Sequence, residues 1–218
     1  MNQVSSDYHQ AHTTPRQPTR RKQQARDVLI GRQADILGNV TAPGVAAAIW
    51  LRRMDASFES WTQGFSAENL PTLRTTVPIS YAETAVLTAC EGAKIPITPE
   101  RQMLAGDVGA LALIFGKIMN TVHVRIRLDV SDDVMCPKFH VDNVPARLLC
   151  TYKGPGTEYV PDNHVTDTKR IRTMRIGSAG LFRGAKWKSN ERTGLLHRSP
   201  AVEPGTGPRL LLVIDTGG

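Results

Sequence analysis

The chain has 218 residues, of which 40% are hydrophobic and 22% charged, and its net charge at pH 7 is +7. This composition can bury one hydrophobic core, and because it contains no run of about 18 apolar residues we expect no membrane span. Three cysteines and an N-terminus without an apolar stretch argue against a disulfide framework and a secretory signal, so we expect a cytoplasmic protein.

Residues 1–27 are predicted to form a disordered basic tail. They are rich in Gln, Thr, Pro and Arg, and they have too few large apolar side chains to offset the entropy lost on ordering. Residues 1–26 hold five basic residues against Asp7: Arg16, Arg20, Arg21, Lys22 and Arg26. Such a tail attracts nucleic acid or other anions only loosely, and a solvated tail is the simpler interpretation.

Residues 28–119 are predicted to be a helical support region, with one or two short strands between Val28 and Val40. Pro43 suits the first turn of a helix. Apolar residues then recur at helical spacing and form one stripe: Ala47, Leu51, Met54, Phe58 and Trp61.

Two further helices follow in the same region. Ser80 and Glu83 have the spacing of a capping box, and Gly92 is suited to end the helix that follows. The next helix is predicted from Thr98 to about Asn120, with its apolar stripe again at helical spacing: Leu104, Val108, Leu111, Phe115 and Ile118.

After Asn120 the apolar period changes to that of strands. Val122, Val124, Ile126 and Leu128 alternate with polar residues, as in a half-buried strand. Further strands are predicted at 138–142, 146–153, 157–160, 169–186 (as a pair), 195–197 and 209–214. Many short strands separated by turn signals indicate a barrel or a sandwich.

Three residues on these strands have the chemistry of a metal site. Residues i and i+2 of a strand point to one side, so His140 and Asp142 present an imidazole and a carboxylate together. His197 would supply a third ligand, giving a two-histidine, one-carboxylate set that leaves open positions and suits Fe(II). Zn(II) on the same ligands would support hydrolysis instead.

Two alternatives for these residues stay open at this point. Polar residues on the surface and in turns would explain each motif taken alone. Four other residues would make a zinc site by residue type, although their spacing matches no common zinc motif: Cys136, His140, Cys150 and His164.

Most of residues 120–218 resemble a bacterial family that is catalogued only as a domain of unknown function, number 1826. The stretch from Cys136 to Tyr159 looks like this family. The segments Gly184–Asn190 and Gly194–Pro200 fit the same family. This resemblance implies no particular reaction.

In their order and spacing, His140, Asp142, His197 and Arg209 also show a more distant resemblance to the 2-oxoglutarate- and Fe(II)-dependent oxygenases. These enzymes are dioxygenases and belong to the oxidoreductases. This resemblance implies an α+β protein in which residues 120–218 form a double-stranded β-helix of the cupin (jelly-roll) type. An N-terminal helical layer would support it, with 28–218 as one compact domain. It also implies that 2-oxoglutarate is a co-substrate whose far carboxylate is held by Arg209, with Thr151 or Tyr152 donating to it and Arg147 as a competing clamp.

The substrate is expected to be a small molecule or an anion. Residues 169–198 hold nine basic residues against Glu191, and a barrel would bring several near the mouth of the site, where they would attract anions. Arg198, Trp187 and Arg183 are the residues expected to face the substrate. Two alternatives remain: a non-enzymatic, cupin-like metal-binding or metal-homeostasis protein, and a nucleic-acid-associated protein. The sequence does not specify the substrate, the resident metal or the oligomeric state.

Overall fold

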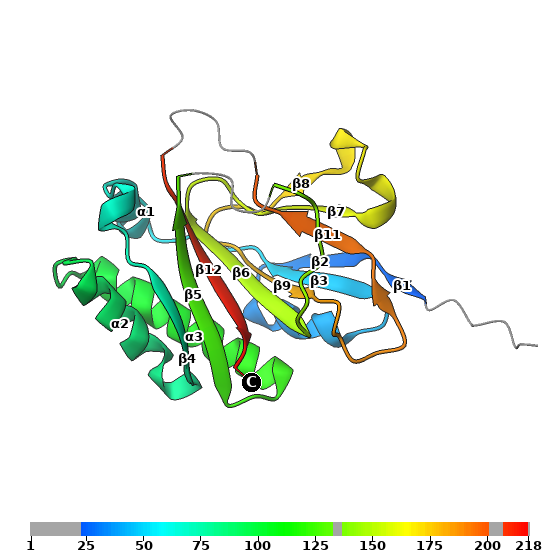
Figure 1. The fold of residues 1–218 in the computed structure, drawn as a ribbon, viewed down its shortest axis with the longest axis horizontal. Coiled ribbons are helices and arrows are strands. Elements are labelled where there is room, and N and C mark those ends of the chain that lie inside the picture. Colours follow the sequence, from blue (N-terminus) through cyan, green and yellow to red (C-terminus); the bar gives the residue numbers. More distant parts are fainter. Residues whose placement is uncertain (1–22, 133–136, 201–206, 218) are drawn as a thin grey trace, which may run out of the picture.

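Strands arranged in two layers form the centre of the fold, and helices cover the outer face of the larger layer (Figure 1). The computed structural model describes residues 23–132, 137–200 and 207–217. The larger, seven-stranded sheet contains, in spatial order, β2 (Asp27–Gly31), β3 (Val45–Trp50), β9 (Ala179–Arg183), β6 (Ala146–Lys153), β12 (Arg209–Thr216), β5 (His123–Ser131) and β4 (Leu73–Pro78). Its strands pair antiparallel except for β2 and β3, which are parallel.

The smaller sheet has the order β11 (Leu195–Arg198), β7 (Glu158–Pro161) and β8 (Arg172–Thr173). A separate parallel pair joins β1 (Gln24–Ala25) to β10 (Arg192–Thr193). The helices are α1 (Ala56–Gln63), α2 (Ala82–Gly92) and α3 (Pro99–Met119). Short 3₁₀ turns are η1 (Ala34–Thr41), η2 (Ala67–Asn69), η3 (Ile79–Tyr81), η4 (Asp162–His164) and η5 (Thr168–Arg170).

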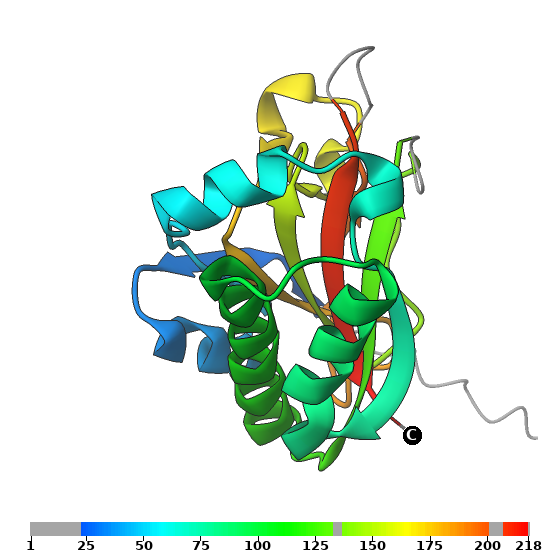
Figure 2. The same cartoon turned by 90° about the vertical axis from the view of Figure 1, so that its left-hand side faces the viewer.

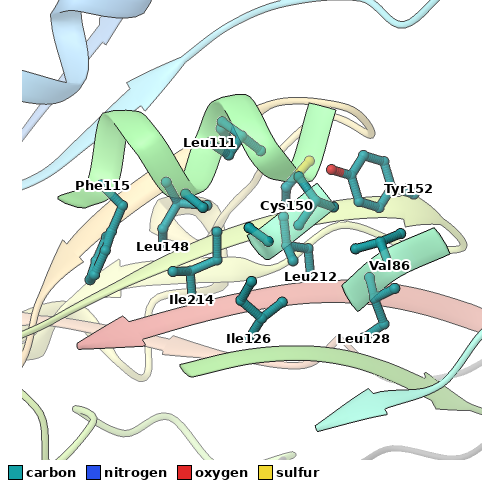
Figure 3. Packing of buried hydrophobic residues seen from close by; sticks show 14 of the residues in the cluster. Val86, Leu111, Phe115, Ile126, Leu128, Leu148, Cys150, Tyr152, Leu212 and Ile214 are labelled. Carbon is teal, nitrogen blue, oxygen red and sulfur yellow. The ribbon is translucent and has the colours of Figure 1, made fainter. Parts of the chain in front are cut away.

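Alternation along β5, β6 and β12 assigns each face of the larger sheet to a different layer. The even-numbered residues face α2 and α3 and form the main core, as Leu148, Leu212 and Ile214 show in Figure 3. The odd-numbered residues up to Thr151 in β6 face the smaller sheet, where Leu149 and Val213 join a second cluster with Phe182 and Tyr159. Lys153 is the exception, because it follows a register shift and donates to carbonyls at the end of α1. Polar side chains at the other odd positions therefore point into the space between the two sheets.

Helix α3 lies across the outer face of the larger sheet, beside α2 (Figure 2). It begins where Thr98 Oγ1 accepts a hydrogen bond from the amide of Arg101 at 3.2 Å, and it ends at Asn120, which has a positive φ of 49°. The predicted third helix is confirmed. By length and composition α3 would also be able to cross a membrane, but here its buried face packs on the sheet.

Two predicted helical features are wrong. The segment Val45–Trp50, expected to begin a helix, is strand β3, and α1 begins only after Asp55, whose carboxylate accepts a hydrogen bond from the amide of Ser57 at 2.8 Å. The predicted capping box does not form, because Ser80 lies in η3 and α2 starts at Ala82 without a side-chain cap.

The predicted division of the chain also needs correction. Strands β2, β3 and β4 join the larger sheet, so residues 28–119 are more than a helical layer. Gln24, Ala25 and Asp27 are strand residues and not part of a disordered tail, and Arg26 between them forms an ion pair with Asp162 at 2.8 Å. The other basic positions of the predicted tail lie outside the described residues. The mixed α and β class is confirmed.

Candidate metal centre and its pocket

A single antiparallel bridge brings two histidines together between the sheets. The amide of His140 donates to the carbonyl of His197, and the amide of His197 donates to the carbonyl of His140, both at 3.0 Å. Residues paired in this way carry their side chains on one face, and the two imidazole rings lie 4.7 Å apart between centroids. The strand predicted at 138–142 is reduced to this bridge.

Asp142 completes the group two residues after His140. Its Oδ2 lies 2.9 Å from His197 Nε2, and its Oδ1 lies 3.7 Å from His140 Nε2. One nitrogen or oxygen atom from each of the three side chains lies within 4.8 Å of the other two. The structure thus brings together the three residues that the sequence singled out as metal ligands.

The arrangement of donor atoms fits a metal ion better than a closed hydrogen-bonded cluster. Among the described residues no partner forms a well-aligned hydrogen bond with the buried Oδ2 of Asp142, although His197 Nε2 is close to it. His140 Nδ1 lies 2.9 Å from the carbonyl of Lys138, which accepts a hydrogen bond from it, and in a neutral ring with this tautomer Nε2 carries the free lone pair. The three side chains therefore point nitrogen or oxygen atoms that can donate a lone pair to a metal ion toward one shared point.

Arg147 fixes the other oxygen of Asp142. It forms an ion pair with Oδ1 through Nη1, while its Nε and Nη2 donate to the two oxygens of the fully buried Asp215 at 2.7 and 2.8 Å. Burial alone would raise the pKa of the Asp142 carboxyl, but contacts with His197, Arg147 and His140 outweigh burial and lower this pKa. The carboxylate is therefore ionised at neutral pH and is ready to bind a cation.

A second charged group, Arg209, is buried beside the same pocket. Its Nε donates to the carbonyl of Pro155 at 2.8 Å, and its Nη atoms donate to the hydroxyls of Ser199, Thr151 and Thr157 at 3.3, 3.2 and 3.0 Å. No carboxylate pairs with it in the part of the chain that the structure describes. Burial lowers the pKa of Arg209 to about 10, so it remains a cation at neutral pH.

The pocket between the sheets connects these two features. Its empty space is about 470 Å³, part of which is open to solvent. Its walls combine metal-site residues, apolar residues and charged residues: Arg127, Asp129, His140, Arg147, Leu149, Thr157, His197, Arg198, Ser199, Leu211 and Val213. Thr157 and Ser199 are shared with the surroundings of Arg209, so the buried cation lies directly behind the pocket wall.

Several predicted site residues are placed elsewhere. Tyr152 lies in the core beside the helices (Figure 3), and its hydroxyl donates to Asp107 at 2.6 Å. Only Thr151 of that pair therefore contacts Arg209. Arg183 is buried and donates to the carbonyls of Val40 and Ala42 and to Glu191, which makes it a structural residue.

Trp187 does not line the pocket and packs against the helix-side core with Arg183 stacked on its ring. Arg198 does line the pocket, where it is paired with Glu158 at 2.7 Å and stacked on Phe139. Among the described residues of the predicted basic cluster, Arg198 alone lines this pocket. Of the several cluster residues that were expected near the mouth of the site, the pocket wall therefore includes Arg198 and no other described one.

The alternative zinc set is not assembled. Cys150 is buried on the helix side of β6, where Arg52 lies 3.7 Å from its sulfur, whereas His140 is on the opposite side of the sheet. Cys136 lies outside the described residues. Within the described ranges, His140, Asp142 and His197 form the one group found with metal-binding geometry.

Three residues of the candidate site were missed by sequence reasoning. Asp215 was predictable, because it follows Arg209 at an even spacing on one strand and must share its face. Thr157 and Ser199 reach Arg209 from loops that are 52 and 10 residues away in the sequence, and no local signal marks them.

Comparisons with known proteins agree with this architecture. A family model described as "Protein of unknown function (DUF1826)" matches residues 31–215. A dioxygenase for auxin oxidation from Arabidopsis thaliana, solved as a 2-oxoglutarate binary complex, aligns with 88% of this chain and 92% of its own at 9% identity and a TM-score of 0.52.

Other solved structures match less well. The rice dioxygenase for auxin oxidation has a TM-score of 0.45 at 12% identity, with 88% of this chain and 82% of its own covered. A collagen prolyl hydroxylase from Paramecium bursaria Chlorella virus-1 has a TM-score of 0.44 at 10% identity, with 81% and 98% covered. None of the curated proteins matches the sequence. The likeness to the Arabidopsis structure concerns the fold, and it confirms the predicted double-stranded β-helix.

Proposed function

This chain belongs to the DUF1826 family, and we propose from its site that it is a mononuclear Fe(II), 2-oxoglutarate-dependent oxygenase. The convergence of His140, Asp142 and His197 between the two sheets carries the proposal. Two neutral imidazoles and one carboxylate form a facial set that suits Fe(II) and leaves coordination positions open. The Arabidopsis protein of similar fold was solved with 2-oxoglutarate, which is consistent with the same co-substrate here.

The ligands would divide the work as follows. His140 and His197 would donate through ring nitrogens, and Asp142 through Oδ2, the oxygen that Arg147 does not hold. Bound there, Fe(II) would supply the chemistry by which oxygen and 2-oxoglutarate are consumed, giving succinate and carbon dioxide, while a substrate is oxidised. The apolar pocket walls at Leu149 and Val213 would limit the access of water to this chemistry.

Arg209 supports the assignment of 2-oxoglutarate as the co-substrate. A buried guanidinium that meets only neutral acceptors has lost its hydration without gaining a counter-ion. The far carboxylate of 2-oxoglutarate would supply that charge through a charge-assisted pair. Thr151, Thr157 and Ser199 would hold the guanidinium in place and offer hydroxyl donors to the same carboxylate.

The direct test uses the full chain, prepared without metal and kept free of oxygen. We expect calorimetry to find one Fe(II) site per chain and 2-oxoglutarate binding that depends on the metal. Admission of air should then produce succinate slowly, even without a substrate. Tight Zn(II) binding combined with no affinity for 2-oxoglutarate would instead support the non-enzymatic metal-binding alternative.

Arg147 is expected to be a positioning residue for the metal and not a clamp for the co-substrate. Replacement of Arg147 by Gln frees Oδ1 of Asp142 and removes the bidentate partner of Asp215. Loss of a residue that orients a ligand commonly weakens metal binding by about 10- to 100-fold. We expect a loss of that size in Fe(II) affinity, measured by calorimetry.

The conservative variant Arg147→Lys separates orientation from charge, since it keeps the cation but cannot make the same forked contacts. It should recover part of the metal affinity. Circular dichroism should establish that both variants fold. If Fe(II) affinity were unchanged while 2-oxoglutarate affinity fell, Arg147 would be the clamp and this assignment would be wrong.

A further inference from the structure

Two arginines on the face of the larger sheet that is turned away from the helices lie directly opposite each other. Arg74 of β4 and Arg127 of β5 are paired Cα partners, so their side chains share the face that looks toward the smaller sheet. Like charges that are directly opposed across two strands destabilise a sheet. This pair therefore needs a reason beyond the stability of the fold.

The two guanidinium groups are poorly satisfied by the protein. They share the carboxylate of Asp129, at 3.5 Å from Arg74 and 3.4 Å from Arg127, which is longer than a charge-assisted hydrogen bond. Neither side chain donates a hydrogen bond to any described residue. By contrast, Arg147, Arg198 and Arg209 are each held by short hydrogen bonds.

The pair is continuous with the proposed active site. Arg127 lines the pocket, and across the sheet it is followed by Val213 and Leu149, which also line it. The side chain of Arg127 is only 19% exposed, whereas that of Arg74 is 69% exposed. A row of side chains thus runs from an apolar pocket wall, through a half-buried cation, to an accessible one.

We propose that Arg74 and Arg127 bind the acidic group of the substrate, a carboxylate or a phosphate, whose apolar remainder lies over Leu149 and Val213. This assignment of the substrate class rests on the proposed function for its reaction, but the binding site itself does not. Two guanidinium groups side by side match two or more oxygens of one anion. The acid would replace the weak contacts to Asp129 and offset the repulsion between the two arginines.

Three probes that share one aromatic ring test the site in the metal-free full chain. Benzoate carries a carboxylate, phenyl phosphate carries a phosphate, and benzamide is neutral. Calorimetry should find that at least one acidic probe binds at least tenfold more tightly than benzamide. The acid that binds more tightly shows whether the substrate's acidic group is a carboxylate or a phosphate. Equal affinity for all three probes would overturn the proposal.

The double variant Arg74→Gln/Arg127→Gln should weaken binding of the acidic probe at least tenfold and leave benzamide unchanged. Its melting temperature should not fall much, because the substitution removes a like-charged pair. The single variant Arg74→Gln, at an exposed position, provides a second measurement that does not depend on the stability of the double variant. Acid affinity equal to that of the unaltered chain in these variants would also overturn the proposal.

A matched control removes the same charge elsewhere. Arg32 and Arg175 are exposed and line neither this pocket nor the β4–β5 face, so Arg32→Gln/Arg175→Gln should keep acid affinity within twofold. Binding of 2-oxoglutarate to the Fe(II)-loaded protein is measured separately and should be the same in both double variants. If 2-oxoglutarate failed to bind at all, the proposed oxygenase function would be wrong. The acid-binding site would still be tested separately by the affinities of the three probes.

Discussion

Replacing His197 with alanine is expected to abolish stoichiometric Fe(II) binding. The substitution removes one of three converging ligands and leaves His140 and Asp142, of which only Asp142 is fully held by other contacts. We expect the affinity to fall by at least 100-fold, about 3 kcal/mol, because two ligands define neither the geometry nor the charge that Fe(II) requires. Anaerobic calorimetry measures this directly.

A second readout is thermal unfolding, since an ion that binds only the folded state raises the melting temperature. This metal-dependent rise should be lost in His197→Ala. The matched control is His123→Ala, which removes an exposed histidine from the start of β5 and should bind Fe(II) like the unaltered chain. If His197→Ala retained full Fe(II) affinity, the metal centre assigned here would be wrong.

Replacing Arg209 with methionine is expected to remove 2-oxoglutarate binding while sparing the metal. Methionine fills a similar volume but carries no charge and no donors. A hydrogen bond to a charged group contributes about 1.5–3 kcal/mol, so the loss of a forked pair should raise the dissociation constant at least 100-fold. Calorimetry on the Fe(II)-loaded variant measures the loss, and Fe(II) affinity itself should change by less than about threefold, because Arg209 contacts none of the three proposed ligands.

Arg198→Met is the matched control, because Arg198 lines the same pocket but is already paired with Glu158. It should leave 2-oxoglutarate affinity nearly unchanged. The opposite pattern, with Arg198→Met abolishing binding and Arg209→Met sparing it, would transfer the clamp to Arg198.

The strands at the centre of the fold were predictable because their two faces have side chains of different kinds, so the residue types alternate along the sequence. In β5 the apolar residues alternate with charged ones, and β6 and β12 alternate between the helix-side core and the pocket. The third helix was equally clear, since Thr98 and Asn120 mark its ends. Local chemistry and burial agree in these elements.

Strand β3 shows why other elements were not predictable. It is buried on both faces, between the two hydrophobic clusters, so its sequence Val-Ala-Ala-Ala-Ile-Trp has no alternation. A short apolar run of this kind reads equally well as part of a helix. Pro43 before it then favoured the wrong choice.

The site was predictable where it depends on local spacing and unpredictable where it depends on distant contacts. His140 and Asp142 are fixed by the strand period, and His197 could be proposed from the order of the motif. Arg183 was expected to face a substrate because it lies in a basic stretch, but carbonyl groups near residue 40 accept its hydrogen bonds. The same limit applies to the pocket cations, since Arg127 and Arg74 became neighbours only through the register of β4 and β5.

The bridge between His140 and His197 has a consequence for the way in which the protein opens. These two residues are joined by a pair of backbone hydrogen bonds, and the smaller sheet around them consists of short strands. Short strands that are bordered by loops separate at a lower free energy than the long central strands β5, β6 and β12. A bound ion would link two parts of the chain that are distant in the sequence. In the metal-free protein, the strands that carry the site should therefore open locally at a lower free energy than the core unfolds.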